Sequence, residues 1–148
     1  MRLDDSFVGV HVRRGDFLTN RSFGACTSDY YDQAIQRIAS VVKNPRIVVF
    51  TNDKAWVDKN FRMGLPYEIY LNSSKNTDIE ELYLMTKFKS LVISNSTFSW
   101  WGAYLNEGPG QYIISPSTWF LKTELQKNVD NFISKEWIVL NNQLELKN

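Results

Sequence analysis

The sequence predicts an α/β fold built on a doubly wound, mainly parallel sheet of five or six strands. Short runs rich in β-branched and aromatic residues alternate with longer segments in which apolar residues recur at helical spacing. Several of the short runs are apolar at nearly every position, which is typical of parallel strands covered by helices on both faces. We therefore expect strands and helices to take turns along the chain around one sheet.

In the first half of the chain, the sequence pattern predicts strands that alternate with helices. Ser28 and Asp29 are candidate N-caps for a helix whose apolar residues run at helical spacing to Val42, before Asn44 and Pro45 stop it. Thr51-Asn52-Asp53 is expected to cap a second, shorter helix. The expected elements are a strand over 7–12, a helix over 28–42, a strand over 46–50, a short helix that carries Trp56, Val57 and Phe61 and ends near Gly64, and a weaker strand over 67–71.

The second half continues the alternation. Thr77 and Glu80 have the spacing of a capping box, which opens a helix with Leu82, Met85 and Phe88 facing inward. A strand over 91–94 is expected at the centre of the sheet. It is followed by an aromatic helix over 98–106, a strand over 112–115, a short helix around 122–127 and a last apolar run over 137–140.

Composition narrows the possible functions. The chain has 148 residues, 43% of them hydrophobic, which fits one compact domain with a real core. The formal net charge is +1 and the charges are scattered, so there is no basic footprint for duplex nucleic acid or an anionic membrane surface. We expect any anion to be bound locally.

The single cysteine, Cys26, and the single histidine, His11, exclude an internal disulfide and a Cys/His zinc cluster. We expect no metal site and no cofactor. No apolar run approaches the roughly 20 residues needed to cross a bilayer. A cytoplasmic protein is expected, and a peripheral position at the inner membrane is compatible with that.

The segment GVHVRRGDF places Arg13 and Arg14 directly after the first predicted strand. In a regular strand the two side chains would point to opposite faces, where an unpaired charge is unfavourable, so the strand is expected to end beside them. Ligands of doubly wound folds bind at the carboxyl ends of parallel strands. Two guanidinium groups followed by the flexible Gly15 would suit a diphosphate there.

Two neighbours of the arginines are candidate helpers. Asp16 can orient one guanidinium, and His11, on the same face as Arg13, can donate a hydrogen bond or pack beneath the site. The alternative is a solvated surface ion cluster that contributes about 1 kcal/mol or less for each pair.

The segment SNSTFSWWGAYLN contributes a second candidate site. Ser96 and Thr97 stand where a predicted strand passes into a helix, and free backbone N–H groups at such a junction bind anions. The alternative is plain helix capping, with Trp100, Trp101 and Tyr104 expected in the core.

The segments HVRRGDF, FTNDKAW, NSTFSWWGAYLN, ISPSTWF and KEWIVL, in that order, resemble the donor-binding half of bacterial α-1,2-fucosyltransferases of glycosyltransferase family 11. The resemblance covers essentially the whole chain. It implies a Rossmann-like domain, the C-terminal half of a GT-B-type enzyme about twice this long. Residues 1–148 would then form a single GDP-fucose-binding domain without the N-terminal acceptor-binding domain.

The resemblance also implies roles for residues. The arginine motif would lie against the diphosphate of GDP-fucose, with the first arginine the more critical, and the strand-helix junction would hold the β-phosphate. Glu81 would read guanine at a position where the family usually has aspartate; Asp78 and Glu80 are alternatives. The implied catalytic residues are Arg13, Arg14 and Asp16, and the implied donor-binding residues are His11, Arg13, Arg14, Glu81, Asn95, Ser96 and Thr97.

The function so implied is inverting transfer of L-fucose from GDP-fucose to the 2-hydroxyl of a galactoside, in glycan or O-antigen synthesis, without a metal ion. Asp16 is the nearest candidate base, although orienting an arginine suits it better; the base could also belong to the absent domain, or no strong base exists. The alternatives are a non-catalytic module that binds GDP or a GDP-sugar, and a fold remnant that binds nothing. Expected partners are the sugar nucleotide and the galactoside, not nucleic acid, and the chain is expected to self-associate or pair with an acceptor domain.

Overall fold

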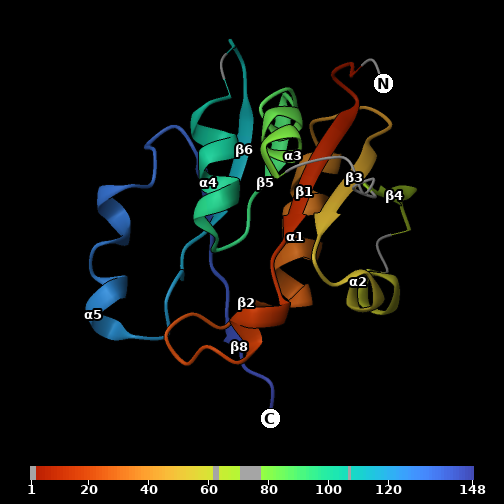
Figure 1. Cartoon of the computed structure of the whole chain (residues 1–148). Helices are drawn as coiled ribbons and strands as arrows, with labels where there is room; N and C mark the ends of the chain where they lie inside the picture. The colour runs from red at the N-terminus through yellow and green to blue at the C-terminus, as the bar shows by residue number, and fades with distance from the viewer. Residues whose placement is uncertain (1–2, 62–63, 71–77, 107) are drawn as a thin grey trace.

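The computed structural model describes residues 3–61, 64–70, 78–106 and 108–148. Its centre is a six-stranded sheet in the order β4-β3-β1-β5-β6-β7 (Figure 1). All neighbouring strands of this sheet pair in parallel, which confirms the predicted α/β class. The strands are β1 (Phe7–Val12), β3 (Arg46–Thr51), β4 (Tyr67–Ile69), β5 (Ser90–Val92), β6 (Tyr112–Pro116) and β7 (Ile138–Leu140).

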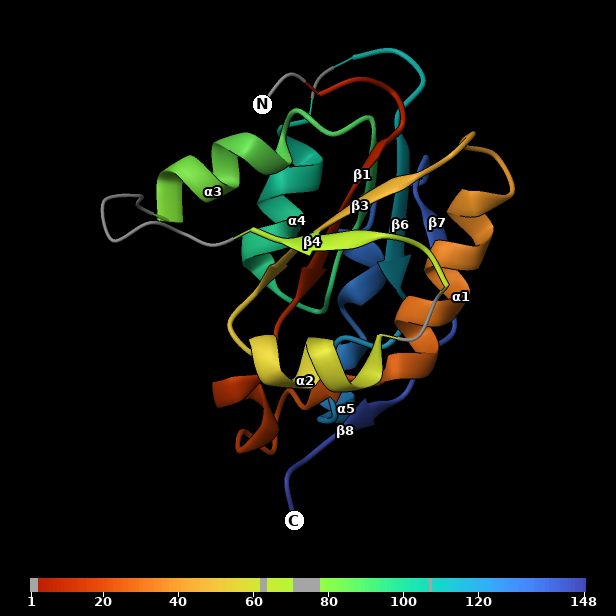
Figure 2. The ribbon, with the colours of Figure 1, turned by 90° about the vertical axis from the view of Figure 1, so that its right-hand side faces the viewer.

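Helices cover both faces of the sheet, as a doubly wound fold requires. Figure 2 shows α1 on one side of the strands and α3 and α4 on the other. The helices are α1 (Ser28–Ala39), α2 (Lys54–Asn60), α3 (Asp78–Met85), α4 (Thr97–Tyr104) and α5 (Thr123–Gln126), with short 3-10 turns η1 (Gly15–Leu18) and η2 (Val129–Asn131). In the described part of the chain, no helix has the length and apolar character that crossing a membrane would require.

Strand β1 shows how alternation builds the two layers. Val8, Val10 and Val12 are fully buried in the cluster that contains the inner face of α1. Phe7 lies in a different cluster, with Met85 of α3, on the other face. Because side chains alternate across a strand, His11 belongs to the face covered by α3 and α4.

The topology creates a switch point between β1 and β5. From β1 the chain builds β3 and β4 on one side of the sheet and then returns to build β5, β6 and β7 on the other. The segments that leave β1 and β5 therefore diverge at the carboxyl edge of the sheet, which is where folds of this kind bind their ligands.

Several predicted boundaries need correction. Helix α1 ends at Ala39 rather than at Val42, although Val42 still packs against the core, and Asn44 has a φ of 51°. Helix α2 ends at Asn60, before the expected end near Gly64, and strand β5 ends at Val92, two residues before Ser94. The capping-box residue Thr77 and the end of the third predicted strand, Leu71, lie outside the described residues.

The sequence did not predict a second, two-stranded sheet. In it β2 (Ala25–Cys26) pairs antiparallel with β8 (Leu144–Glu145), near the C-terminal end of the chain. Both strands have only two residues, so neither carries a recognisable alternating pattern.

Candidate functional site at the carboxyl edge of the sheet

His11 joins the end of β1 to the start of α4. Its Nδ1 lies 2.9 Å from Oγ of Ser94, and its ring centroid lies 5.6 Å from that of Phe98. Burial, and then the charge of Arg13, lower the pKa of His11 to about 3, so the ring is neutral at physiological pH. The two predicted halves of the site, the arginine motif and the β5–α4 junction, are therefore neighbours (Figure 1).

Arg13 and Asp16 form a pair at this edge. Nε and Nη2 of Arg13 donate to Oδ1 and Oδ2 of Asp16 at 3.1 Å and 3.0 Å. The Arg13 side chain is 34% exposed, and that of Asp16 is 60% exposed. Both carboxylate oxygens of Asp16 face the guanidinium, so the geometry suits the orienting role better than that of a free base.

Arg14 has quite different surroundings. Its Nη1 donates to Oε1 of Glu145 at 2.7 Å, and its guanidinium lies 3.9 Å from the centre of a Trp56 ring. Its backbone N–H donates to Oδ1 of Asn52 at 2.9 Å. The residue is 5% exposed, so the expected solvated cluster of both arginines is wrong for Arg14.

The three predicted phosphate ligands at the β5–α4 junction do not have the same surroundings. Ser96 is the N-cap of α4, where its Oγ accepts from the N–H of Phe98 at 3.3 Å, and Thr97 is exposed in the first turn. Asn95 instead points inward, and its Nδ2 donates to the carbonyls of Gly24 and Trp119 at 3.0 Å and 3.1 Å. Ser96 and Thr97 lie at the helix start, whereas the Asn95 amide holds two loops together.

Glu81 lies half-buried in the first turn of α3. Burial, and then the charge of Asp78, raise the pKa of its carboxyl, while Arg13 acts in the opposite direction. Asp78 and Glu80, the alternative positions, are exposed on the same turn.

The aromatic residues of α4 do not all enter the core. Trp100 is partly buried, and its Nε1 donates to the Phe132 carbonyl at 2.8 Å. Trp101 and Tyr104 are 47% and 60% exposed, so the expectation of a core position was wrong for both. The reason is that α4 turns its small residues, Gly102 and Ala103, inward.

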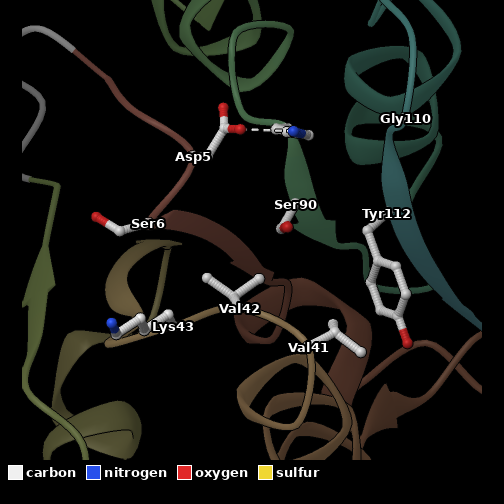
Figure 3. Close-up of a pocket in the computed structure, with 9 residues that line it drawn as sticks. Asp5, Ser6, Val41, Val42, Lys43, Ser90, Gly110 and Tyr112 are labelled. Carbon is white, nitrogen blue, oxygen red and sulfur yellow. Dashed lines mark hydrogen bonds and ion pairs between the residues drawn. The ribbon is translucent and has the colours of Figure 1, made fainter.

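A cavity of about 330 Å³ lies at the opposite, amino edge of the sheet (Figure 3). It is lined by Val41, Val42 and Tyr112, and on one side Lys89 forms an ion pair with Asp5. None of the predicted site residues lines it. Among the described residues, no group of three or more His, Cys, Asp and Glu side chains could hold a metal ion.

The chain was also compared with known protein families. The sequence model of Glycosyl transferase family 11 matches residues 2–141. The chain belongs to glycosyltransferase family 11. That match covers β1 to β7 of the parallel sheet, and therefore both halves of the candidate site.

Relatives in this family include bacterial and mammalian proteins. The O-antigen biosynthesis glycosyltransferase WbnK of Escherichia coli is 35% identical over 132 residues, which cover 86% of this chain and 44% of the relative. An alpha-1,2-colitosyltransferase of Escherichia coli is 34% identical over 80% of the chain and 42% of the relative. Galactoside alpha-(1,2)-fucosyltransferase 2 of Mus musculus is 30% identical over 79% of the chain and 36% of the relative. The family 11 chain thus spans less than half the length of these relatives.

Sequence reasoning did not connect Arg14 of the family 11 chain with four residues that surround it, which are Asn52, Asp53, Trp56 and Glu145. Asn52 and Asp53 directly follow β3, and Asp53 was recognised only as a helix cap, a role confirmed by its bond to the Trp56 N–H at 3.0 Å. Since β3 neighbours β1, the adjacency of their ends could have been inferred from the predicted topology. No sequence signal connects Glu145 with Arg14, because 131 positions separate them.

Proposed function

We propose that this chain is the donor-binding domain of an inverting α-1,2-fucosyltransferase, which transfers L-fucose from GDP-fucose to the 2-hydroxyl of a galactoside in glycan or O-antigen synthesis. One observation carries the proposal: Arg13, oriented by Asp16, directly follows the end of β1, and His11, two residues earlier, lies 2.9 Å from Ser94 at the β5–α4 junction. Relatives whose names specify galactoside fucosyl transfer and O-antigen biosynthesis support the choice of reaction.

The proposed chemistry is mainly electrostatic. As the bond between the anomeric carbon and the diphosphate breaks, negative charge grows on the departing GDP while the acceptor oxygen bonds to the opposite face of the sugar. Donors already in place around that diphosphate stabilise the transition state more than the bound substrate. In this proposal Arg13 and backbone N–H groups at the start of α4 are those donors.

Guanine recognition is assigned to Glu81. Two carboxylate oxygens can accept hydrogen bonds from the N1–H and the 2-amino group of guanine, which adenine cannot donate in that pattern. The half-buried position of Glu81 in the first turn of α3 supports this assignment.

The proton of the acceptor hydroxyl needs a destination outside the Arg13–Asp16 pair. Because both oxygens of Asp16 face Arg13, we assign the proton to a group of the acceptor-binding domain, or to water if no strong base takes part. The positive charge around the diphosphate comes from Arg13 and the helix start, so we propose metal-independent transfer. Transfer unchanged by excess EDTA is the expected result.

A second candidate is a non-catalytic module that binds GDP or a GDP-sugar. The geometry of Asp16 favours it, since both of its carboxylate oxygens face Arg13 and neither is left to act as a base. In both candidates residues 1–148 form one donor domain, and in the first it works with a separate acceptor-binding domain.

The test combines binding with turnover. Calorimetric titration with GDP, with ADP as the control, measures recognition. Hydrolysis of GDP-fucose and transfer to a galactoside are then assayed with the chain alone and with an added acceptor-binding domain, and a colitose donor is included because one relative carries that name. Binding with transfer supports the enzyme, and binding without transfer in either assay supports the module.

Thermal unfolding gives an independent answer. GDP at about 100 times its Kd should stabilise the fold by about 2.7 kcal/mol, which raises the Tm of a domain of this size by roughly 5 to 10 °C. If GDP does not change the Tm and calorimetry detects no binding heat, the domain binds neither GDP nor its sugars. Both candidate functions would then be wrong.

A further inference from the structure

The C-terminal segment holds both ends of the turn that carries the arginine motif. Glu145 Oε1 accepts from Nη1 of Arg14 at 2.7 Å, and the backbone N–H of Lys147 donates to the carbonyl of Leu18 at 2.8 Å. Between these anchors lies η1, which begins with Gly15 and contains Asp16. Strand β8 is kept there by its antiparallel pairing with β2.

Arg14 is enclosed by protein groups on several sides. One face of the guanidinium lies over Trp56 at 3.9 Å, and Nη1 also contacts the carbonyl of Cys26 at 3.4 Å. Nε is 3.6 Å from Oδ2 of Asp53, and it has no hydrogen-bond partner among the described residues. Two carboxylates and a ring thus surround a side chain that is 6% exposed, where a phosphate would meet like charge.

Arg13, the residue before Arg14, has more open surroundings. It faces the single carboxylate of Asp16 and keeps about a third of its side chain exposed. The N–H of Phe17 donates to the carbonyl of Arg14 at 2.9 Å, so the turn that positions Asp16 starts from Arg14 itself. A shift of Arg14 would therefore move the pair that faces the ligand.

We propose that Glu145 and Trp56 are positioning residues: they fix Arg14 as an internal anchor, so that η1 presents Arg13 and Asp16 to the diphosphate. The proposal rests on the proposed function, and it divides the two arginines into one that contacts ligand and one that supports it. Glu145 lies beyond residue 141, outside the part of the chain that the family match covers.

Whether Glu145→Gln weakens or strengthens GDP binding tests the positioning role of Glu145. Glu145→Gln removes one of the two carboxylate charges beside Arg14, the other being that of Asp53. If Glu145 positions the motif, the variant binds GDP several-fold more weakly, because a neutral amide holds Arg14 less firmly than a carboxylate does. If Arg14 itself binds phosphate, the freed guanidinium leaves GDP binding equal or tighter, and the proposal is overturned. Glu136→Gln, an exposed site away from this edge, is the matched control and should bind as the parent does.

Amide hydrogen exchange supplies a readout that does not require GDP. Residues 14–18 should exchange faster in Glu145→Gln than in the parent, and Glu145→Asp, which keeps the charge, should recover part of the protection. Equal protection of this turn in parent and Glu145→Gln would overturn the proposal. If the parent itself fails to bind GDP, the proposed function fails, and the exchange result still decides whether Glu145 positions the turn.

A second variant covers the case in which Glu145→Gln does not fold. Lys147→Pro removes the N–H donor to Leu18 but keeps Glu145, and proline at the next position, Asn148→Pro, is its control. We expect faster exchange at residues 14–18 and weaker GDP binding for Lys147→Pro alone. Identical behaviour of the two proline variants would count against the anchoring role of the C-terminal segment.

Discussion

Arg13 and Arg14 are neighbours in the chain, yet they lie in opposite electrostatic settings. Arg13 is partly exposed and faces one carboxylate, whereas Arg14 is buried between Glu145, Asp53 and the ring of Trp56. The difference lies in the segments that surround them: Asp53, which follows β3, and Glu145 of β8 lie beside Arg14, whereas Arg13 pairs with Asp16 of the turn that follows it.

Arg13→Ala tests the catalytic assignment. In an enzyme completed by an acceptor-binding domain, we expect transfer to fall about a hundredfold to a thousandfold, on the order of 3 to 4 kcal/mol, the effect of deleting an oxyanion-hole donor. The free energy of unfolding should change by about 1 kcal/mol or less, because the pair with Asp16 is exposed. Steady-state kinetics and denaturant unfolding measure the two effects.

The control for this variant is Arg37→Ala, which removes a guanidinium from an exposed position in the last turn of α1. It should leave transfer unchanged. Equal activity of Arg13→Ala and Arg37→Ala would show that Arg13 does not take part in transfer.

His11 predicts a pH dependence of stability. Its pKa is about 3 in the folded chain against an ordinary 6.5, because burial disfavours the charged ring. The unfolded chain therefore binds a proton that the folded chain rejects between these values. The stability that the neutral ring contributes is complete above pH 6.5 and is lost as pH falls toward 3, at about 1.4 kcal/mol per pH unit.

His11→Asn is the variant to compare, since it keeps a hydrogen-bonding group near Ser94 without a titrating ring. Urea unfolding between neutral pH and about pH 4 should show a steeper loss of stability for the parent than for His11→Asn. Glu81 and Asp32, whose pKa values are raised, are present in both chains, so their effects cancel in the difference. Parallel curves would show that His11 is not buried as a neutral ring.

The turn between β1 and η1 depends on Gly15. Its φ of +50° lies in the left-handed region, and a Cβ there would meet Nδ2 of Asn52 at 2.9 Å. Asn52 is also the residue that accepts the backbone N–H of Arg14. A side chain at position 15 would thus disturb the contact that joins the ends of β1 and β3.

Gly15→Ala and Gly64→Ala form a matched pair. Gly64 has a φ of +64°, and a Cβ there would meet nothing within 4 Å. Both variants should lose about 1 to 3 kcal/mol of stability from backbone strain. Only Gly15→Ala should also weaken GDP binding, as measured by calorimetry. Equal GDP affinity in the two variants would separate this turn from the donor site.

The outer faces of α3 and α4 leave apolar side chains in solvent. Ile79 and Tyr83 on α3, and Trp101, Tyr104 and Leu105 on and after α4, are each at least 47% exposed. The two helices pack against each other where Gly102 lies against Met85, and the rings of Trp101 and Tyr104 are in edge contact, with centroids 5.7 Å apart. Exposed apolar surface of this kind favours association.

We expect the chain to self-associate through this surface at raised concentration. Trp101→Lys combined with Tyr104→Lys should reduce the effect in sedimentation velocity, and Val41→Lys, an exposed apolar site at the end of α1, should not. A monomer at every concentration of the parent chain would contradict the expectation.

Much of the architecture could be predicted from local pattern. Near-continuous apolar runs indicated β1 and β3, and the arginines after Val12 indicated that β1 ends there, because an unpaired charge is excluded from a covered sheet. The β5–α4 junction was likewise predicted from its hydroxyl residues, and Ser96 is the N-cap. Spacing along the chain encodes these features because they depend on contacts within a few residues.

Other features of the site depend on contacts between segments that are far apart in the sequence, and only the tertiary structure shows them. His11 and its partner Ser94 are 83 positions apart, and Arg14 and Glu145 are 131 positions apart. The local sequence around each residue therefore does not indicate its partner. Trp101 could not be placed outside from its hydrophobicity, since exposure depends on which face of α4 the neighbouring elements cover. Local preferences specify where strands and helices form, whereas partners and burial are set by how the sheet order brings their ends together.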